Sequence, residues 1–248
     1  MRKKTIGGIV LLMAALLTMG GLLVWKGVWI PNRIFAAGYP VQGVDVSSYQ
    51  GEIDWEILAE QHLSFAYLKA TEGSSFVDPT FARNAEQARK TNLRIGAYHF
   101  FSYDSPGSTQ AENFIRTVQA EEDMLPPVVD LEFYGDKEQN PPAREDVRRE
   151  LTVMLRKLEE AYGVQPVIYA TQKSYTRYLS GEFAEYGIWI RNVYTPPLLP
   201  DGREWTFWQY TDRDKLAGYQ GEEPYIDRNV FCGSPEEFSA YPEKIRLQ

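Results

Sequence analysis

Hydrophobic and polar positions follow two alternating patterns in the body of the chain. Short apolar runs rich in β-branched and aromatic residues are typical of strands, and they occupy residues 43–47, 65–71, 94–101, 127–133 and 165–170. Between these runs, apolar residues recur at helical spacing over residues 54–61, 80–90, 108–120 and 144–162. Asp54 resembles a helix N-cap, and Gly163 fits a helix end. The alternation predicts a parallel sheet joined by right-handed crossovers.

The pattern changes beyond residue 180. Strand-like segments continue without long helical patterns between them, and Pro- and Gly-containing loops separate residues 187–193, 203–211 and 225–231. We therefore predict an α/β fold, an irregular TIM-like β/α barrel of about five βα units closed by about three further strands. In barrels of this kind, functional side chains gather at the C-terminal ends of the strands.

The N-terminal segment is unlike the rest of the chain. Arg2, Lys3 and Lys4 precede an uncharged stretch, residues 6–25, that is long enough to cross a membrane once. Because basic flanks stay in the cytoplasm, everything after the stretch should be exported. We predict a cytoplasmic basic tip and single transmembrane anchor over 1–25, a tether over 26–42, and one barrel domain over 43–248.

A cleaved signal peptide is the alternative interpretation of this segment, and it would make the protein secreted rather than bound to the cell membrane. Two features favour the anchor. The apolar stretch is longer than the usual core of a signal peptide, and no small-x-small cleavage site follows it closely.

Charge and composition exclude several classes of function. Residues 1–38 hold five of the 26 basic residues and no acid, so 21 bases face 34 acids in the remainder, a net charge of −13. This argues against nucleic-acid binding. A neutral sugar chain suits such a surface, whereas a polyanion would need a local basic patch that the sequence does not reveal.

Cysteine and histidine are scarce. With one cysteine no disulfide can form within the chain, and with two histidines a Cys/His metal site is disfavoured. Cys232 is expected to be a small buried hydrophobe and His99 a core or supporting residue. We expect no metal and no cofactor, so any hydrolysis would depend on carboxyl groups.

Two carboxylates interrupt the strand predicted at 127–133. Asp130 and Glu132 are two positions apart, so they project from the same face of a strand. Neighbouring carboxyl groups cannot both ionise freely, so the pKa of one rises. The longer Glu132 is predicted to be the general acid, and Asp130 to stay ionised and stabilise the reacting centre. A structural ion pair with Arg or Lys is the alternative.

Further acids and aromatics end the other strands. Asp45 lies on the first predicted strand, Glu72 follows the second, and Asp227 lies on the last. A cleft lined by acids and aromatic faces suits the stacking of sugar rings and glycoside hydrolysis. Each residue taken singly could instead be a capping acid or a core aromatic. The candidate substrate-binding residues are Glu72, Tyr98, Phe100, Tyr169, Trp208 and Gln209.

Seven segments in order, from about Gly43 to Phe231, resemble glycoside hydrolase family 25, the muramidase-type lysozymes: GVDVSSYQGEIDW, LKATEGSSFVDPTF, IGAYHFFS, PPVVDLEF, VIYA, WQY and IDRNVF. The resemblance implies an irregular β/α barrel that cleaves the β-1,4 bond between N-acetylmuramic acid and N-acetylglucosamine in peptidoglycan. It also implies roles for particular positions: Glu132 as proton donor, Asp130 as its partner, Asp45 and Asp227 as the further acids, Glu72 as the acid of a Lys-x-Thr-Glu-Gly signature, and Tyr98, Tyr169 and Trp208 as sugar contacts.

The resemblance leaves alternatives open. Either a carboxylate attacks the anomeric carbon, or the substrate's own 2-acetamido group does so while Asp130 steadies it. A non-catalytic glycan-binding module on the same barrel and a metal-dependent hydrolase are rival functions. The expected partners are a peptidoglycan glycan strand and, through the N-terminal helix, the membrane; the sequence does not reveal which proteins, if any, bind this one.

Overall fold

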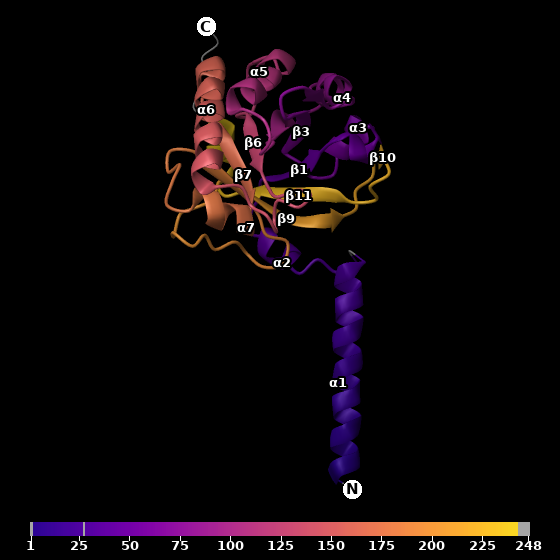
Figure 1. Cartoon of the computed structure of the whole chain (residues 1–248). Helices are drawn as coiled ribbons and strands as arrows, with labels where there is room; N and C mark the ends of the chain where they lie inside the picture. The colour runs from indigo at the N-terminus through magenta and orange to yellow at the C-terminus, as the bar shows by residue number, and fades with distance from the viewer. Residues whose placement is uncertain (1, 27, 243–248) are drawn as a thin grey trace.

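The computed structural model describes residues 2–26 and 28–242, so residues 1, 27 and 243–248 of the predicted domain ranges lie outside it. Eight strands close into a barrel, and helices lie against part of its outer surface (Figure 1). The barrel strands are β1 (Gln42–Val46), β3 (Phe65–Glu72), β5 (Arg94–Phe100), β6 (Val128–Leu131), β7 (Val167–Thr171), β8 (Gly187–Arg191), β9 (Phe207–Asp214) and β11 (Ile226–Phe231).

The barrel closes irregularly, as predicted. Parallel pairing runs from β1 through β3, β5, β6, β7 and β8 to β9, and β11 is antiparallel to both β9 and β1. The predicted antiparallel portion is therefore a single strand, because β8 and β9 keep the direction of the five strands before them. The TIM-like fold class is confirmed.

Helices connect the first five strands. They are α3 (Trp55–Ala59), α4 (Phe81–Ala88), α5 (Gly107–Thr117) and α6 (Arg144–Tyr162), followed after β7 by the short turns α7 (Gln172–Ser174) and η2 (Tyr175–Leu179). The two predicted helix ends are confirmed. The Asp54 side chain accepts a hydrogen bond from the Ile57 amide at 3.1 Å, and Gly163 ends α6 in the left-handed conformation.

Some short elements carried no recognisable pattern in the sequence. Each is too short for periodicity to mark it. They are α2 (Arg33–Ala36), η1 (Ser48–Gln50), β2 (Glu52–Ile53), β4 (Phe76–Val77), β10 (Tyr219–Gln220) and α8 (Pro235–Ala240).

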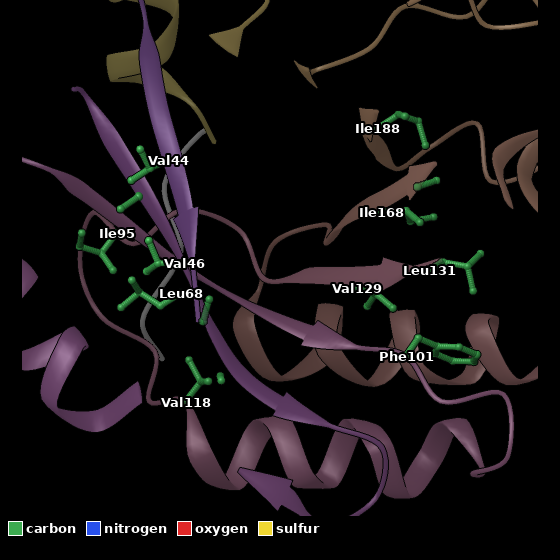
Figure 2. Close-up of a cluster of buried hydrophobic side chains, with 14 of the residues drawn as sticks. Val44, Val46, Leu68, Ile95, Phe101, Val118, Val129, Leu131, Ile168 and Ile188 are labelled. Carbon is green, nitrogen blue, oxygen red and sulfur yellow. The ribbon is translucent and has the colours of Figure 1, made fainter. Parts of the chain in front are cut away.

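Alternation along the strands divides the core into two layers. Outward-facing side chains pack beneath the helices, among them Val44, Leu68, Val129 and Ile168 (Figure 2). Inward-facing side chains fill the lower barrel with Phe65, Tyr67, Val128, Val167, Trp189, Phe207 and Phe231. Because large apolar groups occupy the bottom, the inward positions nearer the C-terminal strand ends are left for polar side chains.

Helices α5 and α6 approach so closely that one position admits only glycine. A Cβ on Gly107 would lie 1.9 Å from the main-chain oxygen of Glu150. We expect Gly107→Ala to lower the free energy of unfolding by about 1–3 kcal/mol, because backbone must move. Gly38→Ala is the control, since its Cβ would meet its nearest neighbour at an ordinary 3.5 Å. Thermal melting of both variants tests this, and equal melting temperatures would contradict it.

The N-terminal helix α1 (Arg2–Trp25) projects from the barrel on the side where α2 lies (Figure 1). Its segment Ile6–Val24 is long and apolar enough to cross a membrane. The chain that follows is not a free tether. Asn32 is fully buried and donates hydrogen bonds to the main-chain oxygens of Asn192 and Tyr210, at 2.9 and 3.0 Å. Part of the predicted tether, 26–42, therefore belongs to the barrel domain.

Candidate active site

A cleft of about 520 Å³ opens at the C-terminal ends of the barrel strands. Parallel strands bring these ends to one mouth, which is why residues far apart in sequence meet there. Its walls carry most of the predicted site residues together with several unpredicted ones. The lining residues are Asp45, Ser47, Tyr49, Gln50, Lys69, Tyr98, Phe100, Val128, Asp130, Glu132, Tyr169, Trp189, Gln209, Asp212, Arg213, Glu223, Tyr225 and Asp227.

Strand β6 carries the central pair of acids. Asp130 lies on the strand and Glu132 directly after it, and both line the cleft as their spacing predicts. Register places Asp130 between Phe100 on β5 and Tyr169 on β7. The Asp130 side chain is 7% exposed, and its buried Oδ1 has no hydrogen-bond partner among the described residues. No hydrogen bond therefore offsets the burial of this oxygen.

A second pair of acids faces the first across the barrel. Asp45 on β1 lies opposite Asp227 on β11, and the two carboxyl groups share a hydrogen bond. Asp45 also accepts from Asn229 Nδ2 at 2.7 Å and from Gln209 Nε2 at 3.0 Å. Asp45 is therefore held in one orientation at the floor of the cleft.

Two aromatic side chains orient these amides in turn. Trp189 Nε1 donates to Asn229 Oδ1, and the Tyr169 hydroxyl donates to Gln209 Oε1, both at 2.9 Å. Neither Trp189 nor Asn229 was among the predicted site residues. Asn229 lies two positions after Asp227 and so shares its face, a signal that the sequence already contained.

Burial favours the protonated form of all four acids. It raises the pKa of Asp130 well above its usual range, and the nearby Glu132 raises it further. Burial also raises the pKa of Glu132, while Arg191 and Lys69 act in the opposite direction. The pKa values of Asp45 and Asp227 are raised as well, chiefly by burial. Glu132 thus meets the requirement for a proton donor. The direction of the shift at Asp130 runs against the expectation that this group stays ionised.

Glu72 lies beside the cleft rather than in its wall. Its carboxylate pairs at 2.7 Å with the ammonium of Lys69, which does line the cleft. Lys69 also lies 5.0 Å from the ring centre of Phe100. Glu72 therefore positions the Lys69 ammonium, whose charge acts on both Asp130 and Glu132, and does not line the cleft itself.

Trp208 is the predicted sugar contact that the structure does not bring into the cleft. It is 1% exposed on the outer side of the barrel, where its Nε1 donates to the main-chain oxygen of Asn192 at 2.9 Å. The reason is strand alternation: Gln209 faces the cleft, so its neighbour Trp208 must face outward. Tyr49 and Tyr225 supply the additional aromatic lining instead.

His99 and Cys232 are not among the residues that line the cleft. His99 is fully buried between Thr71 and Gln110, and burial lowers its pKa to about 4, which agrees with a core role. Cys232 is exposed, so the prediction of a buried cysteine is wrong. Among residues 2–26 and 28–242, no group of three or more His, Cys, Asp or Glu is arranged to hold a metal ion.

Paired carboxyl groups at the mouth of a β/α barrel, next to aromatic faces, define a class of protein: enzymes that hydrolyse glycosidic bonds by acid catalysis. Residues 44–219 match the profile of the Glycosyl hydrolases family 25. The chain belongs to this family and is a glycosidase.

Known proteins resemble the chain over most of its length. A solved family 25 glycosyl hydrolase from Bacillus anthracis has a TM-score of 0.79 and 56% identity, covering 82% of this chain and 94% of its own. The uncharacterized protein YegX of Escherichia coli K12 is 36% identical over 225 residues, 87% of this chain and 80% of YegX. Lysozyme M1 of Streptomyces globisporus is 31% identical over 210 residues, 78% of this chain and 68% of that protein.

Proposed function

We propose that the protein is a peptidoglycan hydrolase that cleaves the β-1,4 bond between N-acetylmuramic acid and N-acetylglucosamine. The observation that carries this proposal is the pair of acids at the end of β6, Asp130 and Glu132, which line one cleft and whose pKa values are both raised. The likeness to Lysozyme M1 supports the choice of substrate.

In the first step, Glu132 donates its proton to the glycosidic oxygen as the bond to the anomeric carbon breaks. The oxygen of the substrate's 2-acetamido group attacks that carbon and forms a cyclic intermediate. A water molecule then adds to the anomeric carbon and returns a proton to the Glu132 carboxylate, which reopens the ring. No covalent bond between substrate and protein forms in these steps.

Asp130 assists by orienting the acetamido group. Asp130 lines the cleft, and its carboxyl group would accept the acetamido N–H, a hydrogen bond that favours the ionised form of that group. Asp130 would then be neutral in the free protein and ionised with substrate bound, where its negative charge stabilises the positive charge that develops on the acetamido group.

The test is to incubate the detergent-solubilised full-length protein with purified peptidoglycan, with and without EDTA. Borohydride reduction of the products identifies the sugar at each new reducing end. We expect reduced muramic acid, released at the same rate with EDTA present. Reduced glucosamine would contradict the proposed bond, loss of activity in EDTA would indicate a metal-dependent hydrolase, and binding without release would indicate a glycan-binding module.

The proposal also covers the location of the protein in the cell. Helix α1 anchors the chain in the cell membrane with the barrel outside, and the apolar residues Val28, Trp29, Ile34 and Phe35, all exposed, lie next to it at the membrane surface. The hydroxyl of Tyr225, a cleft residue, donates to the main-chain oxygen of Lys26 at 3.3 Å. The helix end therefore lies at the rim of the cleft.

We expect the mature protein to remain in the membrane fraction after carbonate extraction and to keep its original N-terminus. Removing residues 1–26 should release an active barrel, whereas removing residues 1–38 should also destabilise it, because the buried Asn32 would be lost. A mature N-terminus beyond residue 25 in the culture medium would show that the segment is a cleaved signal peptide.

A further inference from the structure

A groove adjoins the catalytic cleft at the ends of β7 and β8. Two cavities of about 730 and 400 Å³ share Phe133, Glu138, Gln172 and Lys173, so they form one continuous depression between the loop after β6 and the turns α7 and η2. Phe133 directly follows Glu132, and the charge of Arg191, which lines the groove, acts on Glu132. The groove therefore begins beside the proposed proton donor.

This groove is basic, although the chain as a whole carries a net charge of −8. Its charged lining residues are Arg144, Lys173, Arg177 and Arg191, against one acid, Glu138. Lys173 pairs with Glu138, and Arg191 pairs with Asp212. The sequence did not reveal this patch, because its four cations come from separate elements.

Two of the cations have no carboxylate partner among the described residues. Arg144 donates from Nη2 to the main-chain oxygen of Ser180 at 3.2 Å, and its buried Nε has no partner there. Arg177 reaches only the main-chain oxygen of Pro142, at 3.5 Å, and the ring of Tyr178. Guanidinium groups bind carboxylates through paired hydrogen bonds, so both retain donors for an anionic ligand.

We infer that this basic groove binds the carboxylates of the peptide stem carried by N-acetylmuramic acid, an inference that rests on the proposed function. The sugar rings of the substrate are uncharged, and its negative charge is on a short acidic peptide that branches sideways from the muramic acid ring. A stem leaving the cleft beside Glu132 enters the groove. The acidic surface elsewhere would repel it, so the cations set the direction in which the strand lies.

The test compares two synthetic muropeptide oligomers, one with free stem carboxylates and one with the same carboxylates converted to amides. We expect the wild-type protein to cleave the free-acid substrate with a KM about tenfold lower and a similar kcat. Arg144→Gln and Arg177→Gln should each raise that KM about threefold, and the double variant should abolish the preference, with KM on the amide substrate unchanged. Arg149→Gln is the matched control, since Arg149 lies on α6 outside the groove and pairs with Asp146 and Glu150.

The outcomes separate this inference from the function on which it rests. Cleavage of neither substrate overturns the proposed function itself. Cleavage of both with equal KM, or a preference that survives in the double variant, overturns the peptide-stem subsite alone. Equal KM on the synthetic substrates, combined with a loss of binding by the double variant only to walls that retain teichoic acid, would assign the groove to that phosphate polymer instead.

Discussion

Glu132→Gln is expected to lower kcat on peptidoglycan by about 10²–10⁴-fold, the usual contribution of a general acid. Glutamine has the same shape but no proton to give to the leaving oxygen. KM should change little, because the cleft walls remain. The measurement is the initial rate of reducing-end release, with sedimentation on insoluble peptidoglycan as the test of binding.

A substrate with a better leaving group gives a sharper test of the proton donor. An aryl glycoside with an acidic phenol needs little protonation, so Glu132→Gln should lose much less activity on it than on peptidoglycan. Glu160→Gln is the control, because Glu160 is an exposed residue of α6 away from the cleft. A Glu132→Gln protein with more than a third of wild-type activity, or with equal losses on both substrates, would contradict the assignment of the proton donor.

The barrel could be predicted from sequence because its evidence is local. Strand and helix periods alternate up to residue 170, and the helix signals at Asp54 and Gly163 were correct. What the sequence could not show depends on contacts between distant segments. Asn32 is held against the barrel because its side chain donates hydrogen bonds to the main-chain oxygens of Asn192 and Tyr210. The start of the barrel domain could therefore not be located from composition alone.

The correct and the incorrect predictions of cleft residues have the same cause. Alternation along a strand correctly placed Asp130 and Glu132 on one face. The same rule, applied to the adjacent Trp208 and Gln209, excludes one of the two from the cleft, and the structure excludes Trp208. The prediction had named both residues as candidates. The electrostatic state of Asp130 could not be predicted, since it depends on burial and on a missing hydrogen bond at Oδ1.

Asp130→Asn is expected to lower activity by at least about 10²-fold, because the charge that stabilises the reacting acetamido group is lost. The same change should raise the free energy of unfolding at neutral pH. A buried carboxyl group with a raised pKa makes the native state less stable whenever the unfolded chain can release that proton. Asparagine has no such proton, so its substitution removes the penalty while keeping the shape of the side chain.

The sign and the pH window of this stabilisation follow from the pKa of Asp130 in the native and the unfolded protein. Below about pH 3.9, the ordinary value for Asp, both states are protonated and the variant gains nothing. As the pH rises towards the raised native pKa, the wild type loses stability, and above that pKa the loss is complete. Because the native pKa of Asp130 is raised, the gain in the free energy of unfolding from Asp130→Asn should be larger at pH 7 than at pH 3.5. Urea unfolding at pH 3.5 and pH 7 measures it, with the exposed Asp136→Asn as control, and a gain that did not grow with pH would show that Asp130 is already ionised in the free protein.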